Sequence, residues 1–282
     1  MTRLPYFNDL LLPHNIDVMH TEKNIAEALF ATLMDIPDKS KDNIKARLDL
    51  ATMCDRPKQV MKPPAPGKKW RRTPVDFVLK KDQRKEVLQW IQTLMFPDGH
   101  VANLSRGVNL STMRVLGMKS HDYHIWIERL LPAMTRGYVL EHVWRVLAEL
   151  SYFFRQLCAK ELSRDVIDDL EKVAPVLLCK LEKIFPPGFF LAMQHLILHL
   201  PYEARMGGPV KARWCYPIER CLKVLRKKCR NKCKIEASIV EAYILEEVAN
   251  FTTTYYGDNL PSVHNPPSRY NDGENESNLS LF

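Results

Sequence analysis

Apolar side chains recur along most of this chain at the spacing of an α-helix. In residues 17–34, Ile25, Leu29 and Leu33 stand four residues apart, which places them on one face of a helix. Similar spacing predicts further helices at approximately these positions: 41–53, 80–96, a helix that begins at Ser120, 139–160, 164–185, 188–199, 217–228 and 236–253. No segment alternates apolar and polar residues convincingly, so no β-strand is predicted. The pattern therefore indicates a mainly α fold.

The stripes also predict which helix faces lie in the core. The second helix should turn Ile44, Leu48 and Ala51 inward. Two longer stripes follow: Leu147, Leu150, Phe154 and Leu157 in one helix, and Leu170, Val173, Leu177 and Leu181 in the next. Pro175 lies within the second of these stripes and should kink its helix.

Proline, glycine and charge divide the chain into four expected regions. Residues 57–74 are Pro-rich and basic, which favours a linker or exposed loop because proline removes a backbone donor and blocks helix. The tail is rich in Asn, Ser, Pro and acids and should be disordered. The expected organisation is N-terminal helices in 1–56, a basic linker in 57–79, a helical domain in 80–257 and a disordered tail in 258–282.

Composition limits the cellular compartments and the classes of partner that are expected. The chain has 282 residues, a formal net charge of +8 and 7 cysteines, and its start lacks a signal-peptide layout. We therefore expect reduced thiols in the nucleus or cytoplasm. No apolar run approaches the roughly 20 residues that a membrane span needs, so no membrane partner is expected. The positive charge permits an acidic partner, usually nucleic acid, although a basic protein without such a partner has the same composition.

Two short-spaced pairs suggest a metal site. His195 and His199 stand four residues apart in HLILH, so a helix would present both imidazoles on one face, the arrangement that offers two nitrogens to one metal. The surrounding leucines predict that this helix is buried, where an imidazole needs a partner. Asp17 and His20 form the second pair. Four N and O ligands suit tetrahedral zinc, but Asp17 is also a good helix N-cap and His20 could be an ordinary solvated histidine.

Two other clusters are open to two interpretations. His121 and His124 lie near a predicted helix start and are interpreted as surface and capping histidines, with a metal pair as the alternative. A rival zinc set consists of cysteines near the C-terminus, namely Cys215, Cys221, Cys229 and Cys233. Their spacing is irregular and contains no CxxC, so helix-packing thiols are the alternative.

A basic run surrounds one acid, Glu219. Its cations could contact DNA phosphates. These candidates are Lys211, Arg213, Arg220, Lys223, Arg226, Lys227, Lys228 and Arg230. Glu219 is either an ion-paired surface residue or a carboxylate metal ligand in phosphoryl transfer, which requires further carboxylates that the sequence does not identify. No Ser/His/Asp arrangement, Walker loop or Gly-rich nucleotide fingerprint is present.

Several long motifs, in this order along the chain, resemble plant CACTA (En/Spm-type) transposases. They are HNIDVMHTEKNIAEALFATLM, GMKSHDYHIWIERLLP, LEKIFPPGFFLAMQHLILHLPYEARMGGPV and RWCYPIERCLKVLRKKCRN followed by EASIVEAYILEE. The resemblance covers nearly all of residues 4–257. The resembling region of these transposases follows their catalytic core and continues into a plant domain of unknown function.

The resemblance implies an RNase H-like enzyme with a DDE/D triad, in which a helical insertion precedes the final Glu. It implies that Asp17 and His20 match the first zinc-binding pair of the insertion, and His195 and His199 the second. Glu219 then stands where the last catalytic Glu is expected. The two catalytic Asp residues should precede Asp17, yet Asp9 is the only Asp there and its context does not match. The expected fold is therefore a helical insertion domain without its catalytic sheet.

The sequence thus predicts a transposon-derived C-terminal fragment of a CACTA-type transposase, inactive alone. Its expected cofactor is structural zinc, with Mg²⁺ only if a complete triad is supplied from elsewhere. The expected partners are DNA and other transposase domains or chains. One alternative is a host-retained helical module that binds DNA or protein, and another is an enzyme that borrows carboxylates from a second chain.

Overall fold

The computed structural model describes residues 6–12, 14–53, 56–57, 59–61, 63–68, 70–96, 104–253 and 255. The predicted disordered tail, residues 258–282, lies outside them. The chain divides into two units, Met1–Trp214 and Cys215–Phe282. This division differs from the expected boundaries near residues 57 and 80, because the first unit continues through both of them.

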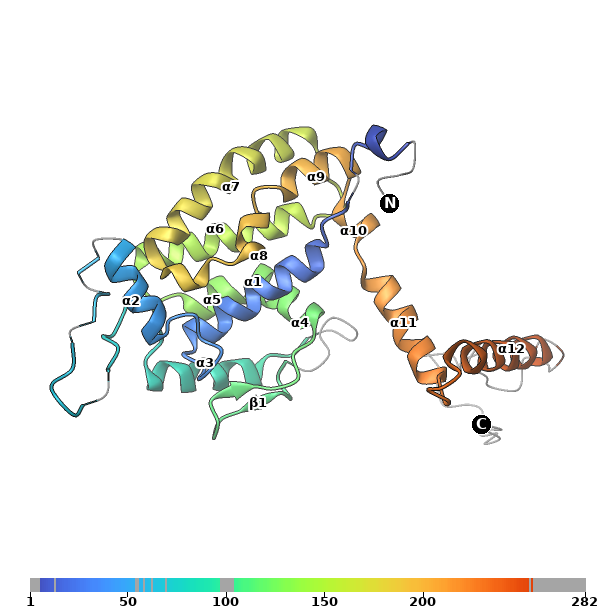
Figure 1. Ribbon diagram of the computed structural model, residues 1–282, viewed down its shortest axis with the longest axis horizontal. Coiled ribbons are helices and arrows are strands. Elements are labelled where there is room, and N and C mark those ends of the chain that lie inside the picture. Colours follow the sequence, from blue (N-terminus) through green and yellow to red (C-terminus); the bar gives the residue numbers. More distant parts are fainter. Residues whose placement is uncertain are drawn as a thin grey trace, which may run out of the picture. The chain divides into compact units, whose positions relative to one another are not determined.

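The first unit is built mainly from helices (Figure 1). Its longer helices are α1 (Val18–Leu33), α2 (Ile44–Met53), α3 (Lys81–Thr93), α6 (Glu141–Leu157) and α7 (Arg164–Ile184). Its shorter helices are η1 (Phe7–Asp9), α4 (Ser120–Ile125), the π-helix η2 (Trp126–Leu130), α5 (Leu131–Thr135), η3 (Pro187–Phe189), α8 (Ala192–Leu196), α9 (Leu200–Gly207) and α10 (Val210–Arg213). The predicted mainly α fold is confirmed.

One antiparallel hairpin accompanies the helices. Strands β1 (Val108–Asn109) and β2 (Arg114–Val115) pair Val108 with Val115. In the part of the chain that the structure describes, this two-residue ladder is the only sheet.

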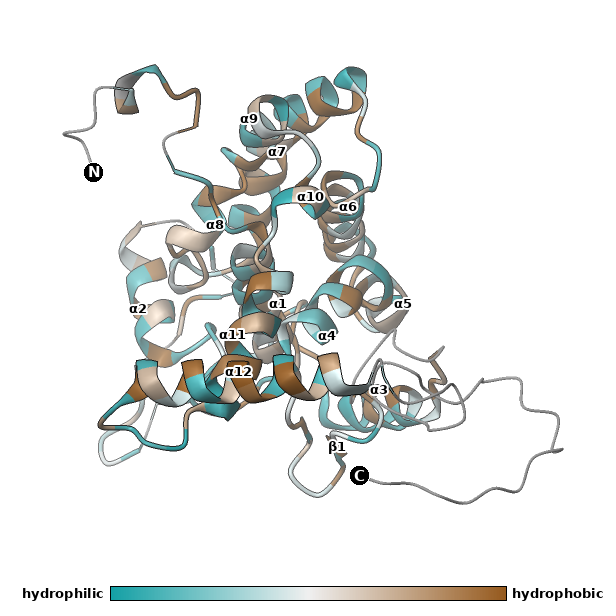
Figure 2. Cartoon of the chain, turned by 90° about the vertical axis from the view of Figure 1, so that its right-hand side faces the viewer, coloured by the Kyte–Doolittle hydropathy of each residue, from teal (hydrophilic) through white to brown (hydrophobic). Residues whose placement is uncertain are grey.

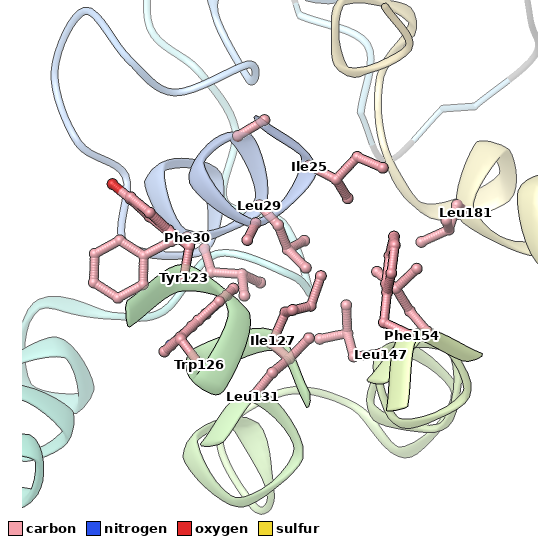
Figure 3. Close-up of a cluster of buried hydrophobic side chains, with 14 of the residues drawn as sticks. Ile25, Leu29, Phe30, Tyr123, Trp126, Ile127, Leu131, Leu147, Phe154 and Leu181 are labelled. Carbon is pink, nitrogen blue, oxygen red and sulfur yellow. The ribbon is translucent and has the colours of Figure 1, made fainter. Parts of the chain in front are cut away.

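The core forms where α1 meets α4, η2 and α6. Figure 3 shows Ile25 and Leu29 of α1 pointing toward Ile127 of η2 and Leu147 of α6. These side chains are fully buried. The apolar stripe predicted for α1 is therefore the surface that joins it to the later helices.

The paired helices α6 and α7 complete this core and run side by side (Figure 1). The predicted stripe of α6 is wholly buried, whereas Val173 of α7 is 40% exposed. Helix α7 begins at the side chain of Ser163, which accepts a hydrogen bond from the Val166 N–H (3.3 Å), and it continues through Pro175.

The predicted inward face of α2 is wrong. Ile44 and Leu48 are about two-fifths exposed, at 39% and 40%, whereas Arg47 is fully buried. The guanidinium of Arg47 forms a salt bridge with the buried carboxylate of Asp42 and donates to the carbonyl oxygen of Gln59 (2.8 Å). A buried ion pair thus lies on the inward face of α2.

The single helix predicted for residues 188–199 is also wrong, since this segment contains η3, α8 and a turn before α9 begins at Leu200. Pro201 explains the break after α8. Its nitrogen carries no hydrogen and its ring clashes with the carbonyl four residues earlier, that of Ile197, so proline here disfavours an uninterrupted helix. Proline is instead tolerated in the first turn of α9.

The predicted basic linker packs on the first unit. Met61, Phe77 and Leu79 are buried in it. The guanidinium of Arg47 also donates to the Thr73 hydroxyl (3.2 Å), which ties this segment to α2. The described residues of this segment therefore belong to the first unit.

The second unit contains helices α11 (Tyr216–Lys228) and α12 (Ile235–Thr253), which contact each other. Neither helix has a buried residue. Apolar bands are visible on α12 in Figure 2. The apolar residues Val240, Ile244 and Val248 of this helix are each more than half exposed. In the described residues, no helix is long and apolar enough to cross a membrane.

Candidate metal centre and basic helix

Four side chains of metal-ligating residue types form a buried group, the metal-ligand cluster, inside the first unit. They are Glu22 of α1, His124 of α4, Glu128 of η2 and Cys158, which follows α6. One donor atom from each lies within 4.8 Å of the others, and all four residues are buried. Chain segments more than a hundred residues apart thus place nitrogen, oxygen and sulfur donors together.

His124 lies between the two carboxylates. Its Nδ1 is 2.7 Å from Oε2 of Glu22, a hydrogen-bonding distance, and its Nε2 is 3.5 Å from Oε2 of Glu128. The indole ring of Trp214 packs edge-on against the imidazole, at 5.8 Å between centroids. The imidazole is therefore fixed by polar groups on both sides and by an aromatic ring.

The local sequence explains why each of these side chains lies in the cluster. Glu22 follows Val18 by four residues and precedes Ile25 by three, so it lies on the buried stripe of α1. His124 and Glu128 are also four residues apart, across the junction where α4 becomes a π-helix. Such π turns are rare and often accompany functional sites. Cys158 is placed by its backbone N–H, which donates to the Phe154 carbonyl (2.9 Å) at the end of α6.

Burial is the largest single influence on the pKa values of Glu128, Cys158 and His124. It raises the pKa of Glu128 to about 7, although the charge of His124 acts in the opposite direction. Burial also raises the pKa of the Cys158 thiol well above its usual value, and the charge of Glu22 adds to this effect. For His124, burial lowers the pKa, but the hydrogen bond and the charge of Glu22 outweigh it, so the pKa is raised.

The predicted zinc ligands lie elsewhere. Asp17 is the N-cap of α1, and its Oδ1 accepts a hydrogen bond from the His20 N–H (3.2 Å). The side chain of His20 is exposed. Helices α1 and α8 are in contact, and His20 and Gln194 line one surface hollow, so the two predicted segments do meet.

His195 and His199 form a close pair. Their Nε2 atoms are 3.1 Å apart, as the four-residue spacing predicted, but both side chains are exposed, so the prediction of a buried pair is wrong. In the described part of the chain, only the buried cluster brings three or more donor residues within 4.8 Å. The structure therefore does not assemble Asp17, His20, His195 and His199, and zinc binding by this set stays a prediction.

The two other sequence clusters are also placed. His124 is buried in the metal-ligand cluster, which corrects its interpretation as a surface histidine, and His121 stacks on it with centroids 5.7 Å apart. Cys221 and Cys233 are exposed, while Cys215 and Cys229 are half-buried. No group of three or more metal ligands arises from these cysteines in the described residues.

Two of the predicted DNA-binding cations have internal partners in the first unit. The Arg213 guanidinium donates to the Gly208 carbonyl (3.2 Å), lies 3.5 Å from the Glu203 carboxylate and bonds Asn15. Lys211 Nζ lies 5.8 Å from the centroid of the Trp214 ring. These contacts make Arg213 a cross-link between α10, α9 and the start of the chain rather than a free phosphate ligand.

The remaining cations belong to the second unit. Arg220, Lys223 and Lys227 are exposed and lie three and four residues apart, so they share one face of α11. Arg226 and Arg230 are exposed too. Lys228 is engaged, because its Nζ pairs with Glu246 of α12 and lies 5.3 Å from the Tyr243 ring.

Glu219, the candidate catalytic carboxylate, is exposed in the first turn of α11, one turn before Lys223. It is not part of any group of three or more metal ligands in the described residues. An exposed acid at a helix N-terminus interacts favourably with the helix dipole.

Residues 157–271 match the family described as Domain of unknown function (DUF4218). The DUF4218 segment thus runs from the last residue of α6 through α12 and includes Cys158, the His195 and His199 pair, and the basic helix. Searches of curated proteins and of solved structures give no match.

Proposed function

We propose that this chain is a transposon-derived helical module that binds DNA through α11 and has no catalytic activity of its own. The observation that carries this proposal is the row formed by Arg220, Lys223 and Lys227 on one exposed face of α11. Cations on one face of a helix can contact successive phosphates without reading bases, which gives binding that is independent of sequence. Such a function belongs in the nucleus.

The resemblance to CACTA-type transposases supports the origin of the module. The resembling motifs continue, in the order of the chain, through the DUF4218 segment. The resemblance itself places a domain of unknown function in this part of the chain. The helical architecture agrees with an insertion domain that has been separated from its enzyme.

The proposed lack of catalytic activity rests on the number and placement of the carboxylates that two-metal catalysis would need. Two-metal phosphoryl transfer needs several carboxylates that hold two ions about 3.5–4 Å apart. Among the described residues, the hairpin of β1 and β2 is the only sheet, so no RNase H-like sheet is present there to position the catalytic Asp residues. Glu219 lies alone on an exposed helix face as a remnant of the triad.

Zinc binding by Asp17, His20, His195 and His199 is part of this proposal. The contact between α1 and α8 supports it, as does the 3.1 Å between the Nε2 atoms of the two histidines. Two nitrogens that share one zinc ion at about 2.0–2.1 Å each must lie at a comparable separation. The carboxylate of Asp17 would have to leave its capping hydrogen bond to join them.

A second candidate function is a docking module for another protein, which includes other transposase domains. The exposed apolar residues of α12 favour it, because isolated surface helices rarely keep so many. DNA binding depends on the cations of α11, whereas docking through the apolar residues of α12 does not.

The test compares two variants that reverse equal numbers of charges. In one, Arg220, Lys223 and Lys227 become Glu; in the other, three exposed cations of the first unit, Lys45, Lys172 and Lys183, become Glu. Fluorescence anisotropy with a labelled duplex measures binding of the full chain. The α11 variant should lose roughly tenfold or more in affinity because phosphate contacts carry the binding. Equal losses in both variants would show a net-charge effect and would remove α11 as the interface.

A further inference from the structure

Two buried carboxylate oxygens in the metal-ligand cluster have no partner. Glu22 is 1% exposed and Glu128 is 7% exposed, and Oε1 of each makes no hydrogen bond. A buried oxygen without a hydrogen bond is destabilising, and more so when it is charged. Each carboxylate also has an oxygen within 4.8 Å of the other ligands. The cluster therefore offers acceptors that the protein itself does not use.

The charges in the cluster are also unequal. Two carboxylates face one imidazole, and the further cations whose charge acts on Glu128 are Lys211 and Arg129. A buried charge is stable only when it is paired or coordinates a metal. One imidazolium cannot neutralise both acids, so a divalent cation would complete the balance.

We propose that Glu22, His124, Glu128 and Cys158 bind one zinc ion. Their donors are one nitrogen, two carboxylate oxygens and one sulfur, which fill a tetrahedral shell. Four protein ligands leave no open position, so the ion is structural rather than catalytic. The proposed zinc function of Asp17, His20, His195 and His199 is independent of this site, because the two sets share no residue.

The donor set selects the metal. Thiolate and imidazole ligands favour zinc and other borderline ions, whereas magnesium and calcium prefer oxygen alone. Binding requires a thiolate, a neutral imidazole and two ionised carboxylates, so the Cys158 proton, one imidazolium proton and any proton on Glu128 pass to solvent. The bound ion, one thiolate and two carboxylates then carry a net charge of −1, and the charges of Lys211 and Arg213 act against it.

The expected consequence is a cross-link within the core. One ion would join α1, the junction of α4 with η2, and the end of α6. Because no such site exists in the unfolded chain, the binding free energy adds to folding stability. The bound ion would then stabilise the first unit as a cross-link between its helices.

The test uses cobalt as a spectroscopic substitute for zinc. The full wild-type chain, stripped of metal, is titrated with Co²⁺, and the thiolate-to-cobalt charge-transfer band is followed. The band should appear with one equivalent and disappear when zinc is added. Cys158→Ser should abolish it while far-UV circular dichroism stays helical, and Glu128→Gln should weaken cobalt binding by roughly tenfold or more.

Two controls separate this site from its rivals. A variant with Ser at Cys215, Cys221, Cys229 and Cys233 should keep the band, and so should the double variant His195→Ala/His199→Ala. If Cys158→Ser fails to fold, Glu128→Gln and the two controls still decide the matter. No band in the folded wild type would show that the cluster is a metal-free polar network. A band that survives in Cys158→Ser, or is lost in the four-cysteine variant, would place the metal elsewhere and overturn the proposal.

Discussion

The Nδ1 of His124 lies 2.7 Å from Oε2 of Glu22, across 102 residues of sequence. This contact joins α1 to α4 inside the core, where both side chains are almost fully buried. The packing of α1 on α4 thus includes a buried polar pair beside the apolar core. Its energetic role can be measured in the metal-free chain.

We predict that Glu22→Ala destabilises the metal-free chain by about 1–3 kcal/mol, because it removes the shorter of the two carboxylate contacts of His124 and leaves Nδ1 buried without its partner. Urea unfolding in the presence of a chelator measures the change. The matched control is Glu27→Ala on the same helix, where the carboxylate pairs with Lys23 and Lys39 nearer the surface and should contribute no more than about 1 kcal/mol. Similar losses in the two variants would contradict the importance of the buried pair.

The buried pair of Arg47 and Asp42 should behave in the same way. Asp42→Ala should cost about 3–5 kcal/mol, because Arg47 stays fully buried with its charge unpaired. The exposed Asp49 of α2 supplies the control, and Asp49→Ala should change the unfolding free energy by less than about 0.5 kcal/mol. A change below 1 kcal/mol in Asp42→Ala would mean that solvent reaches Arg47.

Cysteine reactivity should follow burial. In the metal-free native chain, iodoacetamide at mildly alkaline pH should modify the exposed Cys179, Cys221 and Cys233 quickly and Cys158 slowly. Burial raises the pKa of the Cys158 thiol, so little of the reactive thiolate forms. Mass spectrometry of peptides after brief labelling gives the order. Rapid labelling of Cys158 without denaturant would show that the end of α6 opens readily.

Catalytic silence is the next expectation. The purified chain should neither nick nor join transposon-end DNA with Mg²⁺ or Mn²⁺, because Glu219 stands alone as a candidate catalytic carboxylate on an exposed helix. Gel assays of both reactions provide the measurement, with Glu219→Gln as the control. Activity that is present in the wild type and absent in Glu219→Gln would show that other carboxylates of this chain, or of a second copy, complete a site.

The apolar pattern predicted the core helices well for a simple reason. Ile25, Leu29 and Leu33 of α1 are fully buried. An apolar stripe along one helix face is stabilised when that face packs against the core and is removed from water. The same argument failed for α2. Its buried residue, Arg47, is paired with Asp42 by tertiary contacts, and a pattern that counts apolar residues cannot see such a pair.

The buried metal-ligand cluster was missed because its members are scattered along the chain. A signal did exist, since Glu22 interrupts the apolar stripe of α1, and His124 and Glu128 share a four-residue spacing. Neither feature reveals Cys158, which joins the cluster only when α6 packs beside α4 and η2. Conversely, the strong spacing of His195 and His199 correctly predicted their proximity but not their exposure.

The salt dependence of DNA binding tests the proposed function most directly. Each phosphate contact contributes about 0.9 to the slope of log affinity against log salt concentration, so a wild-type chain that binds through α11 should show a steep negative slope. Replacing Arg220, Lys223 and Lys227 by Glu should reduce that slope by roughly 2–3 units, while the variant at Lys45, Lys172 and Lys183 keeps the wild-type slope. A wild-type chain with no measurable affinity, or an α11 variant with an unchanged slope, would contradict the account.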